Sequence, residues 1–92
     1  MSKIPFKELC GKSIIGDQGG VIGRVTDVVF DEDTGKIISL DFEPSENSPI
    51  PSSEEYYKLI PFTIVKGIKD VVIIEEDKID CIKIISKEEG GE

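Results

Sequence analysis

The side chains of this sequence that could carry chemistry are two cysteines and many carboxylates, and there is no histidine. Without histidine, the chain lacks the group that most often transfers protons near neutral pH. Cys10 and Cys81 lie far apart in the sequence, and neither has a second cysteine nearby at metal-ligand or redox spacing. One lysine stands near each, Lys12 and Lys83, which is a weak means of lowering a thiol pKa. We therefore expect two free thiols rather than a disulfide, and no nucleophilic or redox centre.

The acidic run at residues 31–35 is the segment most similar to a calcium-binding loop. An EF-hand loop places oxygen ligands at about positions 1, 3 and 5, glycine at 6 and glutamate at 12. Counted from Asp31, position 5 is Gly35 and position 12 is Phe42, so the pattern fails. We predict instead a hairpin turn whose acidic side chains bond to the local backbone, with Gly35 in the left-handed region.

The other carboxylates and glycines also argue against catalysis. Glu75 and Glu76 stand in a polar stretch and are expected to be solvated. The glycines between positions 16 and 23 lack the Lys-Ser/Thr ending and the following helix that a phosphate loop requires. We predict that the protein is not an enzyme and holds neither a cofactor nor a metal.

The charge of the chain limits the classes of molecule that it is expected to bind. It has 92 residues, with 11 basic and 19 acidic side chains and a formal net charge of -8. Binding to a nucleic-acid backbone needs clustered lysine and arginine, and Arg24 is the only arginine. Anionic membranes are disfavoured for the same reason, and no segment has the pattern of a signal peptide or of a membrane span. We expect a cytoplasmic protein that binds neither nucleic acid nor membrane directly.

The elements that must position these residues are mostly short strands. Isoleucine and valine dominate the apolar residues, and branched side chains fit a pleated surface better than a helix. Residues 21–30 give the longest strand signal, and residues 36–42 alternate cleanly as the returning strand. Val25, Val28 and Phe30 can face one side only if the strand has a bulge near residues 26–27. Further strand signals cover residues 11–16, 56–60, 63–68, 71–74 and 79–85.

These signals predict one mainly β domain over residues 1–92, a small barrel of about six short strands with little helix. Residues 1–9 form a lead-in that could supply an edge segment. Residues 17–20 form a turn. Residues 43–55 are rich in proline, serine and glutamate, offer little to bury apart from Ile50, and are expected to form a long exposed loop. Residues 87–92 form a polar tail.

The order of these pieces resembles the PRC-barrel family over residues 9–75. The family pattern opens with Gly-Lys, continues through a G-x-V-x-D-V-V-F-D stretch into T-G-K, and ends with an I-P-F and a D-V-V-I segment. The positions that carry the family pattern here are Gly23, Asp27, Asp31, Gly35, Pro61, Phe62 and Asp70. Asp27 could be a structural carboxylate at the bulge or part of a binding groove, and Asp70 is expected to cap a turn. The polar insert at 43–55 and Lys69, where the family has glycine, depart from the pattern.

The resemblance implies the barrel more directly than a function, because one fold serves many roles. The chain is similar to single-domain archaeal PRC-barrel proteins, some of which act in FtsZ-based cell division as adaptors. The resemblance implies a non-enzymatic protein-interaction adaptor whose partners are a SepF-like division protein and other PRC-barrel proteins. It also implies recruitment to the division site. The alternative is a factor associated with ribosome and RNA maturation, as in the RimM branch of the family.

Two groups of residues are predicted to make the protein contacts, at the barrel rim and at a sheet edge. Tyr56 and Tyr57 end the acidic loop, and tyrosine is favoured at interfaces, although one of them could instead pack beneath the loop. The segment at 79–85 could complete the barrel or pair across a dimer through Ile79, Ile82 and Ile84. We expect a homodimer or a hetero-oligomer.

Overall fold

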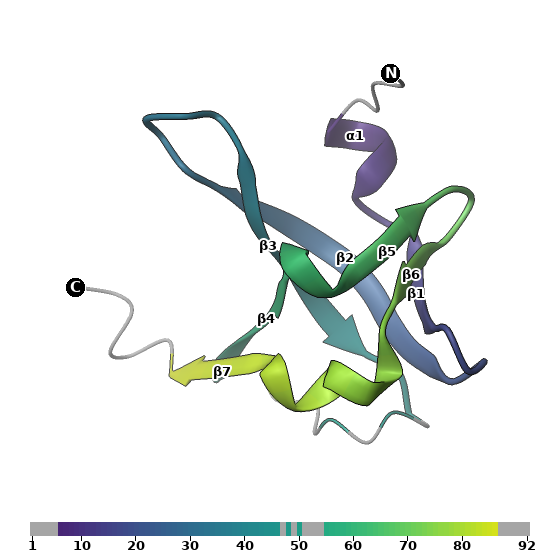
Figure 1. Ribbon diagram of the computed structural model, residues 1–92. Helices are drawn as coiled ribbons and strands as arrows, with labels where there is room; N and C mark the ends of the chain where they lie inside the picture. The colour runs from purple at the N-terminus through teal and green to yellow at the C-terminus, as the bar shows by residue number, and fades with distance from the viewer. Residues whose placement is uncertain (1–5, 47, 49, 51–54, 87–92) are drawn as a thin grey trace.

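The computed structural model describes residues 6–46, 48, 50 and 55–86 (Figure 1). Residues 47, 49 and 51–54 of the expected loop, and the whole expected tail at 87–92, lie outside the described residues. The elements in chain order are α1 (Phe6–Leu9), β1 (Ser13–Gly16), β2 (Val21–Phe30), β3 (Ile37–Pro44), β4 (Tyr56–Pro61), the 3-10 helix η1 (Phe62–Ile64), β5 (Val65–Ile68), β6 (Val72–Ile74), the 3-10 helix η2 (Glu76–Cys81) and β7 (Lys83–Ser86).

The described strands form one sheet that curls into a half-barrel. Its strand order is β5-β6-β1-β2-β3-β4-β7, and every pairing is antiparallel except that of β1 with β6. The mainly β fold is confirmed, with seven strands in the described part of the chain where the sequence predicted about six. Figure 1 shows the β2–β3 hairpin extending away from the curl, and β7 lying beside β4 at the opposite end of the sheet from β5.

The core fills the concave face of the sheet. Val28, Leu40 and Ile60 lie directly opposite one another on β2, β3 and β4, so they share this face, and all three are buried. Leu9 of α1 packs into the same core. The other buried apolar side chains are Ile14, Ile22, Val25, Phe42, Ile64, Val72 and Ile74. Branched aliphatic residues thus supply most of the burial that stabilises the domain.

The predicted bulge in β2 is confirmed by a register shift between Val25 and Asp27. Because the shift changes which side the following residues face, Val25 and Val28 both point into the core. The inward position considered for Phe30 is wrong. A second register shift follows Val29, and Phe30 lies opposite Ile37 with 56% of its surface exposed.

The predicted turn at residues 31–35 is also confirmed. The Asp31 carboxylate accepts the N–H groups of Asp33 at 2.7 Å and Thr34 at 3.2 Å. Gly35 has a φ of 74°, which side chains with a Cβ rarely adopt, and its N–H donates to the Asp31 carbonyl. The turn therefore closes on itself through local hydrogen bonds.

Both ends of the predicted barrel differ from expectation. The described part of the lead-in, Phe6–Leu9, forms the short helix α1 rather than an edge segment, and residues 1–5 lie outside the described residues. The strand predicted at 79–85 is wrong in its bounds: η2 extends to Cys81, and the strand β7 begins at Lys83. Glu76 and Asp77 in the first turn of η2 favour helical backbone at its N-terminus, and this outweighs the strand preference of the isoleucines that follow.

Candidate functional site

An exposed apolar surface at one end of the sheet is formed by β4 and β7, and we name it the β4–β7 edge. Its members are Tyr56, Tyr57, Ile84 and Ile85, with exposed fractions of 40%, 39%, 48% and 37%. In the antiparallel pairing, Tyr57 lies opposite Ile85, and Lys58 lies opposite Ile84. The edge thus combines residues that are far apart in the sequence.

Apolar side chains line both faces of this edge. Ile60 faces the core, so the alternation of β4 places Tyr56 and Lys58 on the concave side and Tyr57 on the convex side. Because opposite residues share a face, Ile84 belongs to the concave side and Ile85 to the convex side. β7 ends the strand order, so the backbone on its outer side faces no other described strand.

Three of the five predicted interaction residues meet at this edge. Tyr56, Tyr57 and Ile84 lie together, whereas Ile79 and Ile82 are half-buried and pack against the core. Ile85 was missed. Its neighbour Ile84 points to the opposite face, and both are exposed only because β7 lies at the end of the sheet, which the sequence alone does not reveal.

Lys58 supports the concave side of the edge and was not predicted. It is buried, with 7% of its surface exposed, and its Nζ donates to the Tyr56 carbonyl at 2.9 Å. Its backbone N–H donates to the Asp41 carboxylate at 3.4 Å. A buried ammonium group needs an acceptor such as the Tyr56 carbonyl, and the aliphatic stem of Lys58 adds apolar contact area beside Ile84.

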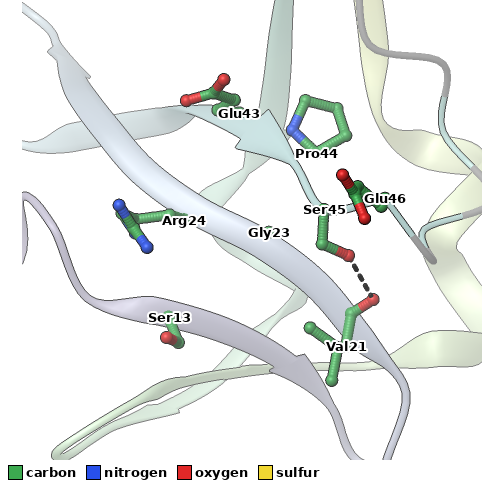
Figure 2. Close-up of a pocket in the computed structure, with 8 residues that line it drawn as sticks. All are labelled: Ser13, Val21, Gly23, Arg24, Glu43, Pro44, Ser45 and Glu46. Carbon is green, nitrogen blue, oxygen red and sulfur yellow. Dashed lines mark hydrogen bonds between the residues drawn. The ribbon is translucent and has the colours of Figure 1, made fainter.

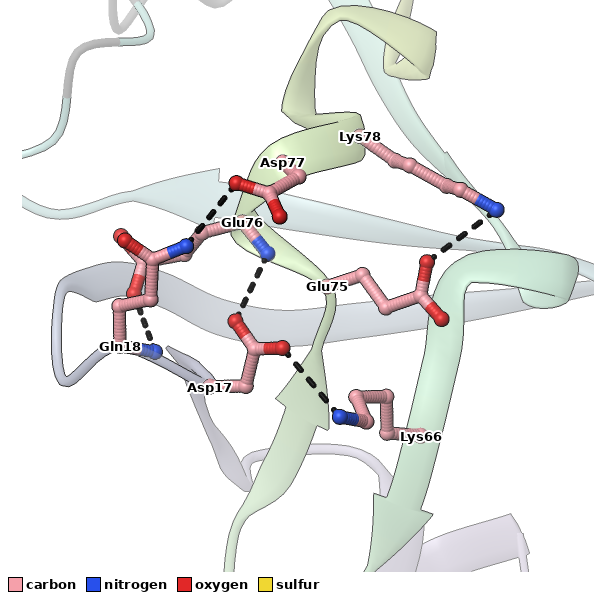
Figure 3. A network of polar contacts seen from close by, with 7 residues as sticks. All are labelled: Asp17, Gln18, Lys66, Glu75, Glu76, Asp77 and Lys78. Atoms are coloured by element: carbon pink, nitrogen blue, oxygen red, sulfur yellow. Dashed lines mark hydrogen bonds and ion pairs between the residues drawn. The ribbon is translucent and has the colours of Figure 1, made fainter.

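A polar cluster of Asp17, Gln18, Gly20, Glu76 and Asp77, which we name the turn clasp, joins the β1–β2 turn to the start of η2 (Figure 3). The Glu76 carboxylate accepts the backbone N–H of Gln18 at 2.7 Å and that of Gly20 at 3.1 Å. In return, the Asp17 carboxylate accepts the Glu76 N–H at 3.1 Å, and Gln18 donates through Nε2 to Asp77 at 3.0 Å. The prediction that Glu76 is solvated is therefore wrong.

Charge also stabilises the turn clasp. Asp17 pairs with Lys66 at 3.3 Å. Glu75 and Lys78 pair at the same distance beside the clasp, but neither reaches the β1–β2 turn. The pKa of Asp17 is lowered, chiefly because its carboxylate accepts the Glu76 N–H and also because Lys66 lies beside it. Two glycines make room for this contact: a Cβ on Gly16 would collide with the Glu76 side chain, and one on Gly20 would crowd its carboxylate.

A shallow groove of about 390 Å³ lies over β1, β2 and the end of β3 (Figure 2). Arg24 lies directly opposite Ser13 on one side and Glu43 on the other, so the three side chains share the convex face. Ser45 bonds through its hydroxyl to the Val21 carbonyl at 3.3 Å. The groove is open and polar, and its charged groups are exposed rather than gathered around one point.

The residues of the family pattern occupy separate structural positions. Gly23 is buried where a Cβ would collide with the Glu43 carbonyl. Asp27 is exposed, and its carboxylate accepts the Val28 N–H at 2.8 Å beside the bulge. Pro61 and Phe62 are half-buried where β4 passes into η1. Asp70 is exposed in the bend between β5 and β6.

The two thiols have different surroundings. Burial raises the pKa of the Cys10 thiol, and the nearby Asp27 carboxylate raises it further, which disfavours the nucleophilic thiolate. Cys81 is exposed, and both thiols are free. No described group of three or more potential ligands is arranged to hold a metal ion. Among residues 6–46, 48, 50 and 55–86, no helix is long and apolar enough to span a membrane.

Comparisons with known proteins agree with this architecture. Residues 1–80 match the PRC-barrel domain, a wider range than the 9–75 expected from the sequence, and β7 lies beyond it. The chain is also 49% identical over 84 residues to an uncharacterized protein of the archaeon Methanocaldococcus jannaschii. That alignment covers 91% of this chain and 94% of the relative. The half-barrel sheet and the match over residues 1–80 together show that this chain belongs to the PRC-barrel family.

Proposed function

We propose that this protein is a non-enzymatic adaptor that binds other proteins through the β4–β7 edge. The observation that carries the proposal is the presence of four large exposed apolar side chains on both faces of a terminal strand pair. Such an edge offers backbone groups for strand pairing and apolar contacts on either side. Tyrosine and isoleucine at this surface provide rigid contact area that loses little conformational entropy on binding.

The partner that we propose is a SepF-like division protein or another PRC-barrel protein in the cytoplasm, with recruitment to the division site. Two findings support this proposal: the family assignment and the 49% identity to an archaeal protein of nearly the same length. The formal charge of -8 favours a protein partner over a nucleic acid, since each phosphate contact would require a lysine or arginine side chain.

The test is a binding titration of the purified protein against a purified SepF-like protein, with the variants Ile85→Asp and Ile38→Asp. Ile38 is the matched control because it is equally apolar and 50% exposed but lies on the β2–β3 hairpin, away from the β4–β7 edge. We expect Ile85→Asp to weaken binding at least about tenfold, which corresponds to ~1.4 kcal/mol. Ile38→Asp should bind as the unmodified protein does. Equal affinity for all three proteins would refute the assigned edge.

The RimM-like alternative has a separate readout. Co-sedimentation of the protein with ribosomal particles that persists at moderate salt would favour it, because purely electrostatic association weakens steeply as salt rises. We expect no such co-sedimentation.

A further inference from the structure

β7 contributes less to the core than the other strand that ends the sheet. β5 and β7 each pair with a single strand and have no buried residue, but Val65 and Ile68 of β5 pack against the core, whereas no residue of β7 does. It also lies outside residues 1–80, the part that matches the family domain. Segments with few buried contacts and a single pairing partner open at a lower free energy than the core does. β7 is therefore the strand that separates from the sheet most readily.

The connection to β7 can act as a hinge. No residue of η2 is buried, and Lys78 interrupts its helical backbone with φ −111° and ψ 19°. The turn clasp fixes the chain up to Asp77 through Gln18 and Gly20. Beyond the clasp, contact with the core is limited to the half-buried Ile79 and Ile82. Residues 78–86, which we name the arm, can thus swing from a fixed point.

The site that the arm would leave behind has a defined shape. Without β7, β4 would be a bare edge with Tyr56 and Lys58 on one face and Tyr57 and Leu59 on the other. The segment already seen to fit this edge is β7 itself, in antiparallel register with Ser86 opposite Tyr56 and Lys83 opposite Leu59. A second copy of the chain carries the same segment, so its arm restores every pairing that is lost.

We propose that two copies of this protein exchange arms, with β7 of each copy pairing with β4 of the other. The closed monomer and the exchanged dimer contain the same β4–β7 pairing. The equilibrium between them therefore depends on the conformation of the hinge and on the new contacts between the copies. Any contact between the exposed apolar residues of the two β4–β7 edges would favour the dimer, because it would remove apolar surface from water. The arm of the same copy competes at an effective concentration on the order of millimolar, so exchange increases with protein concentration.

The charge of the chain adds a salt dependence with a defined sign. Two copies of formal charge -8 repel each other, and added salt screens this repulsion. The dimer fraction should therefore rise with salt, opposite to an association driven by attraction between charged surfaces.

The test uses disulfide trapping between two distinguishable copies, both with Cys10→Ser and Cys81→Ser to remove the native thiols. One copy carries Tyr57→Cys and the other, of different mass, carries Ile85→Cys. These positions are directly opposite in the β4–β7 pairing, where Cα atoms are ~4.5–5.5 Å apart and a disulfide can form. The control pairs Tyr57→Cys with Ile84→Cys, whose side chain faces the opposite side of the sheet.

After concentrated incubation and mild oxidation, we expect at least about tenfold more mixed disulfide with Ile85→Cys than with Ile84→Cys. Homodimers of Ile85→Cys without mixed disulfide would overturn the exchange and show that two β7 edges pair side by side. A chain that carries both Tyr57→Cys and Ile85→Cys provides a further check. If it forms only an intramolecular disulfide, and the single variants give no mixed disulfide, the exchange is also overturned. Light scattering of the unmodified protein is a second measurement, and a strict monomer at every concentration and salt would contradict the proposal.

This inference deepens the proposed function, because both rest on the β4–β7 edge. The two fail separately. The disulfide-trapping experiment contains no partner protein, so a negative result there would not bear on the adaptor role. The affinity of Ile85→Asp for a SepF-like protein would still test that role. Conversely, a negative binding titration would count against the adaptor role, and a mixed disulfide would still support the exchange of arms.

Discussion

Removing the Glu76 carboxylate should destabilise the fold through the β1–β2 turn. In Glu76→Ala, the backbone N–H groups of Gln18 and Gly20 lose their acceptor. The Gly20 contact is partly buried, and leaving such a donor unsatisfied costs ~1–3 kcal/mol. The Gln18 contact is exposed, so water replaces the carboxylate and the loss there is ~0.5 kcal/mol. Together these terms give a decrease of roughly 1.5–3.5 kcal/mol in the free energy of unfolding, and we expect about 2 kcal/mol because the Gly20 contact is only partly buried.

Chemical and thermal unfolding followed by circular dichroism measures this loss. For a domain of this size, about 2 kcal/mol corresponds to a Tm lower by roughly 8–16 °C. The matched control is Glu75→Ala, which removes the adjacent glutamate and its exposed ion pair with Lys78 and should cost less than ~0.5 kcal/mol. A loss below ~0.5 kcal/mol in Glu76→Ala, or equal losses in both variants, would refute the role assigned to the clasp.

Two further predictions concern the turn clasp and the close approach of β2 to β3. The pKa of Asp17 is lowered in the folded state, so the unfolded chain binds more protons than the folded chain does. The contribution of Asp17 to stability is therefore present above its ordinary pKa of 3.8 and is lost as the pH falls through the pKa of the folded state. Urea midpoints measured above and below that value should therefore differ less in Asp17→Asn than in the unmodified protein, and identical differences would contradict the assignment. In Gly23→Ala, the added Cβ collides with the Glu43 carbonyl, so we expect a loss of ~1–3 kcal/mol in thermal melts. Gly67→Ala, where the added Cβ meets nothing within 4 Å, should change stability by less than ~1 kcal/mol.

The hairpin and the bulge could be predicted because their signals are local. The turn at 31–35 depends on Asp31 and Gly35, and the bulge in β2 follows from the spacing of Val25 and Val28. Each involves residues that are neighbours in the sequence, so period and turn chemistry are sufficient to identify them. The family pattern falls on the same strands, which made the fold the most predictable property of the chain.

The turn clasp and the β4–β7 edge could not be predicted, because both depend on which strands become neighbours. Glu76 looks solvated in the sequence, since the backbone N–H groups of Gln18 and Gly20 that donate to its carboxylate lie in a turn near the other end of the chain. Isoleucine has the same strand preference at positions 79, 82 and 84, yet the first two pack against the core and the third is exposed. Propensity describes a residue's fit to a pleated surface and does not say which face of the molecule that surface occupies.

The parallel pairing of β1 with β6 also constrains how the domain folds. β1, β2, β3 and β4 are neighbours in both sequence and sheet, so each can pair with the strand made just before it. Ile14, in contrast, meets Val72 only after all the intervening strands have been synthesised. Closing so long a loop costs chain entropy before any contact compensates for it, and pairings of this kind slow folding. The return of β6 to β1 is therefore expected to be the late step of folding, and until it occurs the outer backbone of β1 remains open to pairing with other nascent chains.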